Sequence, residues 1–111
     1  MTSIGKKEFY KCTSLKAITI PSKVKTIGES AFSGCKKLTK ATIGNGVTKI
    51  GKKAFYNCKK LKSVTIKTTK LKTVGKHAFK VIAKQAIIKC PAKKLKKYRK
   101  MFQKSKLAKT V

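Results

Sequence analysis

A twelve-residue pattern recurs along this chain at nearly constant spacing. The pattern, Ile-Gly-x-x-Ala-Phe-x-x-Cys-x-x-Leu, starts at Ile4, Ile27, Ile50 and Val74, so successive copies lie 23, 23 and 24 residues apart. A repeat of this length is typical of a solenoid, in which each coil buries its apolar side only against its neighbours. The repeat therefore constrains the architecture strongly and the function weakly, because solenoids present surfaces and usually do no chemistry.

Each coil is predicted to carry one short strand. Residues 17–20 and 63–66 alternate with period two and are rich in β-branched side chains. Equivalent strands should stack in parallel, about 4.7–4.9 Å apart. The next segment, apolar-x-x-Ile-Gly, is expected to turn the chain back, with the glycine supplying a backbone angle or a close approach that a side chain would forbid. A short helical turn is expected over x-x-Ala-Phe-x-x-Cys, and the extra residue of the third coil falls in a loop at 67–70, where an insertion is tolerated.

The pattern changes after the fourth phenylalanine. Residues 86–90 lie 24 positions after the third strand and are predicted to form a fourth and last strand, which Pro91 ends. The stretch 92–102 then has one apolar and one basic face at helical spacing. Its apolar positions are Leu95, Tyr98, Met101 and Phe102. We expect this helix to lie across the final coil and cap the core; a membrane-surface or partner-binding helix is the alternative.

The first coil has no such cap. It carries Glu8 where the later coils have alanine, and an acid is tolerable there only if that edge is exposed. We therefore expect an uncapped N-terminal edge that either continued into upstream coils or meets another chain. Self-association through this edge is expected to be possible, because an open strand edge is prone to pairing.

The charge balance is extreme. The chain has 31 lysines and arginines against 2 acids, a formal net charge of +29, and Arg99 is its single arginine. This predicts a polyanion partner, such as nucleic acid, an acidic glycan or an anionic envelope, with a merely solvated lysine surface as the alternative. Lysine lacks the fork of arginine, so any nucleic-acid binding should be non-specific. No stacking platform is expected, because tryptophan is absent and the tyrosines and phenylalanines mostly fall at repeat or cap positions.

No catalytic or metal-binding arrangement is predicted. Cys12, Cys35 and Cys58 form a ladder one coil apart, and Cys90 falls at an inward strand position. We interpret them as packed thiols. A disulfide and a zinc site are less favoured alternatives, because zinc needs about four convergent ligands and the sole histidine, His77, falls at an outward position. With two glutamates and no aspartate, paired-carboxylate catalysis is excluded, so we expect no enzyme and no cofactor.

Neither a membrane-spanning segment nor a signal peptide is recognised in the sequence. No apolar stretch is long enough to cross a membrane, so no membrane insertion is expected. No signal peptide precedes the first repeat. We therefore expect either a protein that stays inside the cell or a piece of a longer chain whose export signal lies upstream.

Residues 4–79 resemble the repeat of the BspA-like bacterial leucine-rich repeat family, on the extended pattern Ile-Gly-x-x-Ala-Phe-x-x-Cys-x-x-Leu-x-x-Val-x-Ile-Pro-x-x-Val-x-x-Ile. Residues 80–111 resemble the lysine-rich closing helix of such arrays. The resemblance implies an α/β solenoid, a right-handed leucine-rich repeat coil with a parallel sheet of about four short strands and a C-terminal capping helix. It implies a single leucine-rich repeat domain over 1–111, a fragment of a longer array. It also implies a cell-surface or secreted protein that binds proteins, cells or glycans without catalytic residues or cofactors.

Two outward surfaces are candidate ligand sites. A protein or anionic glycan would use the outward side of the strands, termed the strand face: Thr19, Lys40, Thr42, Ser63, Thr65, Lys67 and Lys89. A polyanion would use the lysine rows and the closing helix, termed the lysine surface: Lys36, Lys37, Lys52, Lys53, Lys59, Lys60, Lys93, Lys94, Lys96, Lys97, Arg99 and Lys100. We expect a non-enzymatic module for protein or glycan recognition and adhesion. The alternatives are a sequence-independent binder of nucleic acid, heparin-like or teichoic-acid glycan, and a structural stalk or cap.

Overall fold

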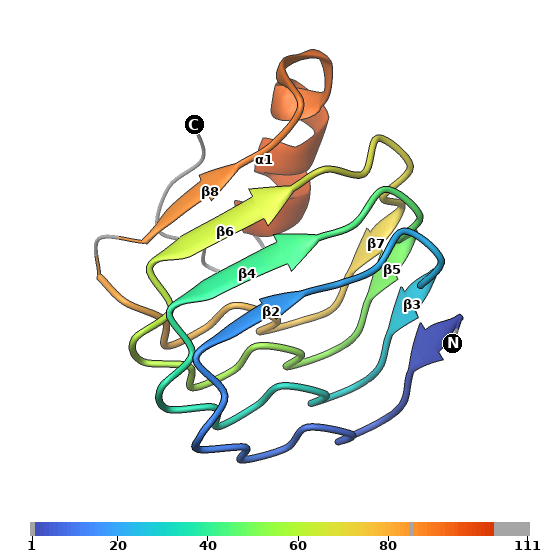
Figure 1. The fold of residues 1–111 in the computed structure, drawn as a ribbon. Coiled ribbons are helices and arrows are strands. Elements are labelled where there is room, and N and C mark those ends of the chain that lie inside the picture. Colours follow the sequence, from blue (N-terminus) through green and yellow to red (C-terminus); the bar gives the residue numbers. More distant parts are fainter. Residues whose placement is uncertain (1, 85, 104–111) are drawn as a thin grey trace.

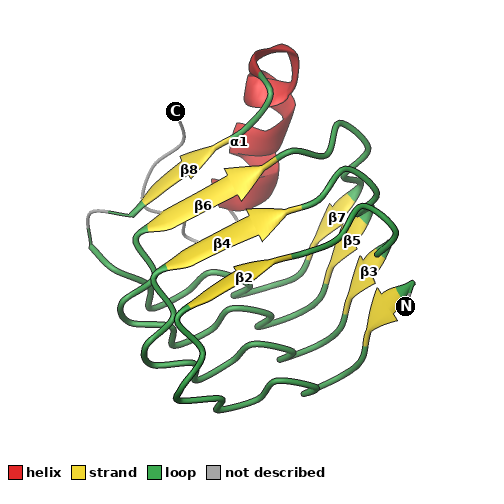
Figure 2. Cartoon of the chain, in the orientation of Figure 1, coloured by secondary structure: helices red, strands yellow, loops and turns green. Residues whose placement is uncertain are grey.

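Four coils stack side by side in the structure, a computed structural model that describes residues 2–84 and 86–103 (Figure 1). Each coil contributes one strand to each of two parallel sheets, and a helix lies at the far end of the stack (Figure 2). The side chains of Leu95, Arg99 and Phe102, which the sequence places on the closing helix, lie outside the described part of the chain.

The larger sheet confirms the predicted strands. Its parallel strands follow the order β2-β4-β6-β8. They span Ala17–Thr19 (β2), Lys40–Ile43 (β4), Ser63–Ile66 (β6) and Ile87–Lys89 (β8). Equivalent residues pair without slippage, so Thr19 lies beside Thr42 and Thr42 beside Thr65. Because side chains alternate across a strand, this register stacks every inward position on the inward position of the next coil.

A second parallel sheet replaces the predicted return turn, so the prediction of one strand per coil is wrong. Its strands, in the order β1-β3-β5-β7, span Ser3–Ile4 (β1), Thr26–Ile27 (β3), Lys49–Ile50 (β5) and Thr73–Val74 (β7). The Gly28 N–H donates to the Ile4 carbonyl at 2.7 Å. Coils held in register bring backbone donors and acceptors opposite one another, so a ladder forms over as few as two residues.

The repeated glycines are required by a close approach of backbones. A Cβ on Gly28, Gly51 or Gly75 would lie 2.7, 2.7 or 2.3 Å from a backbone atom of the preceding coil. None of the three has a left-handed φ. Of the two roles that the sequence suggests for these glycines, the close approach is therefore confirmed.

The segment between each glycine and the next cysteine position forms a wall of turns, termed the turn wall, and the predicted helical turn is wrong. The Ala31 N–H donates to Gly28 three residues back at 3.2 Å, whereas the Phe32 N–H donates to Ala54 of the next coil at 2.7 Å. A helix is not formed because alternate donors bond to the neighbouring coil. Two residues per coil adopt left-handed φ angles of 55–77°: Lys7, Ser30, Lys53 and His77 in one row, and Lys11, Gly34, Asn57 and Val81 in another.

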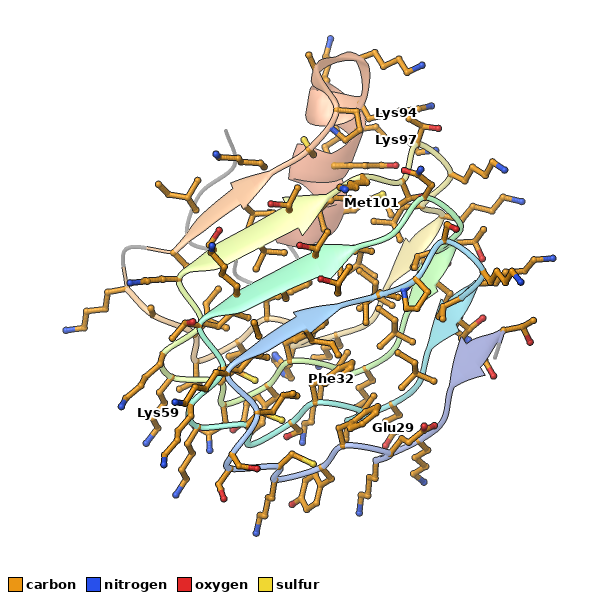
Figure 3. All side chains as sticks on the ribbon, in the orientation of Figure 1. Glu29, Phe32, Lys59, Lys94, Lys97 and Met101 are labelled. Carbon is orange, nitrogen blue, oxygen red and sulfur yellow. The ribbon has the colours of Figure 1, made fainter. Side chains whose placement is uncertain are left out.

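The phenylalanines confirm the predicted apolar column. Phe9, Phe32, Phe55 and Phe79 stack ring on ring, with neighbouring centroids 5.0–5.2 Å apart and ring planes within 8° of parallel. Figure 3 labels Phe32 inside the coil, and the last three rings are fully buried. The ring spacing is close to the 4.7–4.9 Å that separates hydrogen-bonded strands, so the side chains and the backbone share one repeat distance.

Glu8 partly caps the N-terminal edge that the sequence predicts to be open. In later coils the repeated glycine donates its N–H to the preceding coil, as Gly28 does to Ile4. Gly5 instead donates its N–H to Oε1 of Glu8 at 2.7 Å, and Glu8 is exposed as predicted. The apolar residues of this coil that remain half-buried are Phe9, Cys12, Leu15 and Ile18.

The predicted closing helix is confirmed at the opposite end. A 3-10 turn at Ala92–Lys94 (η1) leads into α1, Leu95–Gln103. Tyr98 of α1 is fully buried; its hydroxyl donates to the Thr68 carbonyl at 2.7 Å and accepts the Leu71 N–H at 3.2 Å. Burial raises the pKa of the Tyr98 hydroxyl, which therefore keeps its proton and its donor role at neutral pH.

The loop that contains the one-residue insertion of the third coil binds this tyrosine. Thr68 lies within the inserted loop and is fully buried. Its hydroxyl donates to the Val47 carbonyl at 2.8 Å and accepts the Lys70 N–H at 3.0 Å. The loop tolerates an extra residue, as the sequence suggests, and Thr68 within it helps to anchor the helix.

Replacing Phe55 by alanine should lower the free energy of unfolding by about 3–5 kcal/mol, because the rings on either side cannot close the cavity. Urea unfolding followed by circular dichroism measures the change. Lys59→Ala, at an exposed position, is the control and should stay within about 0.5 kcal/mol of the parent. An unchanged melting temperature for Phe55→Ala would contradict its inward placement.

Replacing Tyr98 by phenylalanine should cost about 1–3 kcal/mol, because the Thr68 carbonyl and the Leu71 N–H share its buried hydroxyl. The urea midpoint measures this loss. Tyr56→Phe, which removes a hydroxyl from the turn wall, is the matched control and should change stability little. Equal effects of the two substitutions would show that the helix is not anchored through this hydroxyl.

Two single substitutions in the second left-handed row should change the free energy of unfolding in opposite directions. Val81→Asn should raise the free energy of unfolding by about 1 kcal/mol, because a left-handed backbone disfavours β-branched residues and tolerates asparagine. Asn57→Val, at the equivalent position of the previous coil, should lower it by a similar amount. Thermal unfolding of both variants tests the pair, and a loss of stability in both would argue against the left-handed assignment.

Candidate functional site

The core holds packed thiols. All four cysteines are free, and within residues 2–84 and 86–103 no three His, Cys, Asp or Glu side chains gather closely enough to hold a metal ion. Cys35 and Cys58 donate their Sγ–H groups to the carbonyls of Phe9 and Phe32 at 3.2 and 3.1 Å. The neighbouring Cys35 sulfur and burial raise the pKa of the Cys58 thiol, which favours its unreactive protonated form. His77 is half-buried, so it is less exposed than its predicted outward position suggests.

The strand face forms two rows across the larger sheet. One row pairs Thr19, Thr42, Thr65 and Lys89, and the other pairs Ala17, Lys40, Ser63 and Ile87. Thr42, Ser63 and Thr65 are half-buried, whereas the remaining predicted residues, Thr19, Lys40, Lys67 and Lys89, are exposed. The structure therefore brings the predicted strand-face residues together as a narrow band of hydroxyls bordered by ammonium groups. Lys67 lies at its margin, one residue beyond β6.

The lysine surface is divided into separate groups. Lys36, Lys37, Lys59 and Lys60 are exposed where the turn wall leads into the larger sheet. Lys52 is exposed and Lys53 half-buried on the turn wall, beyond β5. Figure 3 shows Lys59 far from Lys94 and Lys97, which lie at the capping helix. The helix region exposes Lys93, Lys96, Lys97 and Lys100, with Lys94 half-buried.

Two of these groups border hollows of about 510 Å³ each. The first lies beside the larger sheet and is lined by Thr39, Lys60, Lys62, Ala83 and Lys84. The second lies along the helix and is lined by Lys93, Lys96, Lys97, Lys100 and Met101. Both can accept an anion by charge alone, because no described lining residue is acidic.

The turn wall has a polar hollow that sequence reasoning missed. It measures about 290 Å³ and is termed the serine notch; its lining is Lys7, Tyr10, Glu29, Ser30, Ser33, Lys52, Lys53 and Tyr56. Tyr10 is 42% exposed, so this tyrosine is open to solvent although no role was assigned to it from the sequence. The sequence does contain a pattern that indicates these outward tyrosines, because Tyr10 and Tyr56 directly follow inward phenylalanines and lie two coils apart.

Comparison with known proteins identifies relatives with the same repeat. A model of the BspA type leucine rich repeat region matches residues 2–111 in six copies. A leucine-rich repeat protein from Bacteroides ovatus ATCC 8483 is 29% identical with a TM-score of 0.79, over 99% of this chain and 28% of that one. The T. pallidum leucine rich repeat protein is 24% identical with a TM-score of 0.54, over 82% of this chain and 53% of that one, and supports the fold alone. No curated protein matches.

Between residues 2 and 103, leaving out residue 85, no helix combines the length and the apolar composition that crossing a bilayer requires.

Proposed function

Because the chain belongs to the BspA-type leucine-rich repeat family, we propose that it is a non-enzymatic recognition module of a bacterial cell-surface or secreted protein. Leucine-rich repeat proteins generally bind other proteins. The ligand proposed here is a protein or a glycan that carries negative charge, and the module serves adhesion. The chain spans about a quarter of the Bacteroides protein it matches, so the role proposed is that of a module within an array.

The observation that carries this proposal is the distribution of charge. The chain has a formal net charge of +29, and its two acids, Glu8 and Glu29, lie in the first two coils. The lysines in the described part of the chain lie outside a continuous apolar core. A net charge of this size raises the rate of encounter with an anionic surface. Added salt screens the charge and lowers this rate.

The strand face supplies hydrogen-bonding groups, which can position a ligand more closely than net charge alone. Its paired threonines and serine place hydroxyl donors and acceptors at the strand repeat of about 4.7–4.9 Å. Lys40, Lys67 and Lys89 border this band and are exposed. Steering by the whole field, followed by hydrogen bonds to the band, would give a protein or glycan ligand a defined position.

A sequence-independent polyanion binder is the second candidate, and the separate lysine hollows favour it. Lys60, Lys62 and Lys84 converge on one hollow, and four lysines converge on the hollow beside the helix. Point charges of this kind attract phosphate and sulfate without reading a sequence. Nucleic acid, heparin-like glycan and teichoic acid would then bind by the same contacts.

Two variants that each remove three charges should separate these candidates. The proposed recognition role predicts that Lys40→Gln/Lys67→Gln/Lys89→Gln weakens binding at least about tenfold. Lys36→Gln/Lys37→Gln/Lys60→Gln, the matched control, should weaken it only about two- to threefold. Affinities for heparin, duplex DNA, teichoic acid and an extracellular matrix protein would be measured by calorimetry over a range of salt concentrations.

The salt dependence of binding identifies the results that would contradict the recognition role. Equal losses in both variants, with a slope of about 0.9 per neutralised phosphate on duplex DNA, would favour the sequence-independent binder. Binding to none of these ligands would contradict both candidates and leave a structural stalk or cap.

A further inference from the structure

On the turn wall, the second coil carries small side chains where the coils on either side carry large ones. One row runs Lys7, Ser30, Lys53, and a parallel row runs Tyr10, Ser33, Tyr56. Backbone hydrogen bonds between neighbouring coils hold these rows in register. The Lys11 N–H donates to the Ser33 carbonyl and the Gly34 N–H to the Tyr56 carbonyl, both at 2.8 Å. The second coil has serine in both rows, which creates the serine notch between two coils with large side chains.

Each side of the notch is a tyrosine paired with a lysine. The Lys7 Nζ lies 5.2 Å from the centroid of the Tyr10 ring, and the Lys53 Nζ lies 5.3 Å from that of Tyr56. At these cation–π distances an ammonium group lies over each aromatic ring, and the Lys11 Nζ also lies over the Tyr10 ring, at 5.3 Å. A ligand in the notch would therefore meet a ring and a positive charge from both sides.

The bottom and the rim of the notch are polar. Ser30 and Ser33 are only 7% and 6% exposed, so their hydroxyls form a fixed base that can both donate and accept hydrogen bonds. The rim carries Glu29 and Lys52. With three lysines and one glutamate in its lining, the notch has an excess of two positive charges.

The spacing of the coils selects the thickness of the ligand. Two strand repeats place the backbones of the first and third coils about 9.5 Å apart. The chair of a pyranose is thicker than a flat base, and this separation leaves room for it between the two coils.

We propose that the serine notch binds one anionic sugar residue, a hexuronate or a sulfated hexose, within a larger glycan. The rings of Tyr10 and Tyr56 flank the sugar, Lys7 and Lys53 hold its carboxylate or sulfate, and the serines bind its hydroxyls. Glu29 accepts a further sugar hydroxyl and disfavours a ligand with a continuous row of phosphates. This inference rests on the proposed recognition function and assigns it a ligand class and a site apart from the strand face.

Filling the notch without changing the charge is the sharpest test. Ser33→Tyr does this, and tyrosine already occupies the equivalent position in the coils on either side, so the variant should fold. A heparin-derived tetrasaccharide would be titrated by calorimetry at 0.15 M NaCl, with thermal unfolding as the check on folding. We expect Ser33→Tyr to weaken binding at least tenfold, and Tyr10→Ala, at an exposed position, to weaken it similarly.

Two controls separate the notch from the general field. Ser33→Ala keeps the space and should weaken binding about two- to threefold, through one lost hydroxyl. Lys59→Gln/Lys60→Gln removes two charges outside the notch and should also cost no more than about threefold. Unchanged affinity in Ser33→Tyr and Tyr10→Ala, or losses no larger than that of the double lysine variant, would overturn the proposal.

The outcomes also distinguish this inference from the recognition function itself. If the strand-face triple variant loses the tetrasaccharide and Ser33→Tyr keeps it, the recognition function stands and the notch is not its site. If the parent binds neither the tetrasaccharide nor any ligand of the earlier series, both proposals fail. If a DNA duplex binds with the same sensitivity to Ser33→Tyr, the notch takes nucleic acid and the glycan assignment is wrong.

Discussion

Close backbone contact between successive coils is the constraint on which the rest of this structure depends. Gly28, Gly51 and Gly75 leave no room for a side chain where one coil crosses the next. The phenylalanine rings repeat at 5.0–5.2 Å, which is compatible with that contact, and the cysteine thiols bond to carbonyls of the neighbouring coil. The repeated apolar positions are thereby directed inward, and a chain with a net charge of +29 can remain compact because its lysines need not be buried.

A stack of this kind has unpaired backbone groups at both ends, and the chain covers the two ends to different extents. At one end the Glu8 carboxylate accepts the N–H of Gly5, whose equivalents in later coils bond to the preceding coil. At the other end α1 places Tyr98 against the inserted loop of the third coil. A single side chain therefore supplies one acceptor at the first edge, whereas a whole helix covers the last.

The sequence was sufficient for the features that depend on side-chain identity. The spacing of Phe32, Phe55 and Phe79 predicted the column, and the alternation within 63–66 predicted a strand. The second sheet and the alternating bonds of the turn wall were not predicted, because they depend on the distance between backbones. Gly34 and Asn57 are residues that tolerate left-handed positions, but Lys11 and Val81 at the equivalent positions of other coils concealed the pattern.

The same distinction applies to the candidate sites. The strand face could be located from the sequence, because alternation along one strand separates outward from inward residues. The serine notch could not be recognised in this way, since it arises from differences between coils: Tyr10, Ser33 and Tyr56 occupy the same position but differ in size. Reading a solenoid for function therefore requires comparing outward positions across the coils as well as along the chain.

The seat of Tyr98 also affects how an array of this type can change in length. The helix contacts the 24-residue coil through the Tyr98 hydroxyl, which bonds to Thr68 and Leu71. Recombination between the 23-residue coils before it, which share the repeat pattern, could add or delete whole coils upstream without altering these two hydrogen bonds. The last two coils and the helix would be inherited as one block, while the extent of the outward surface varied freely.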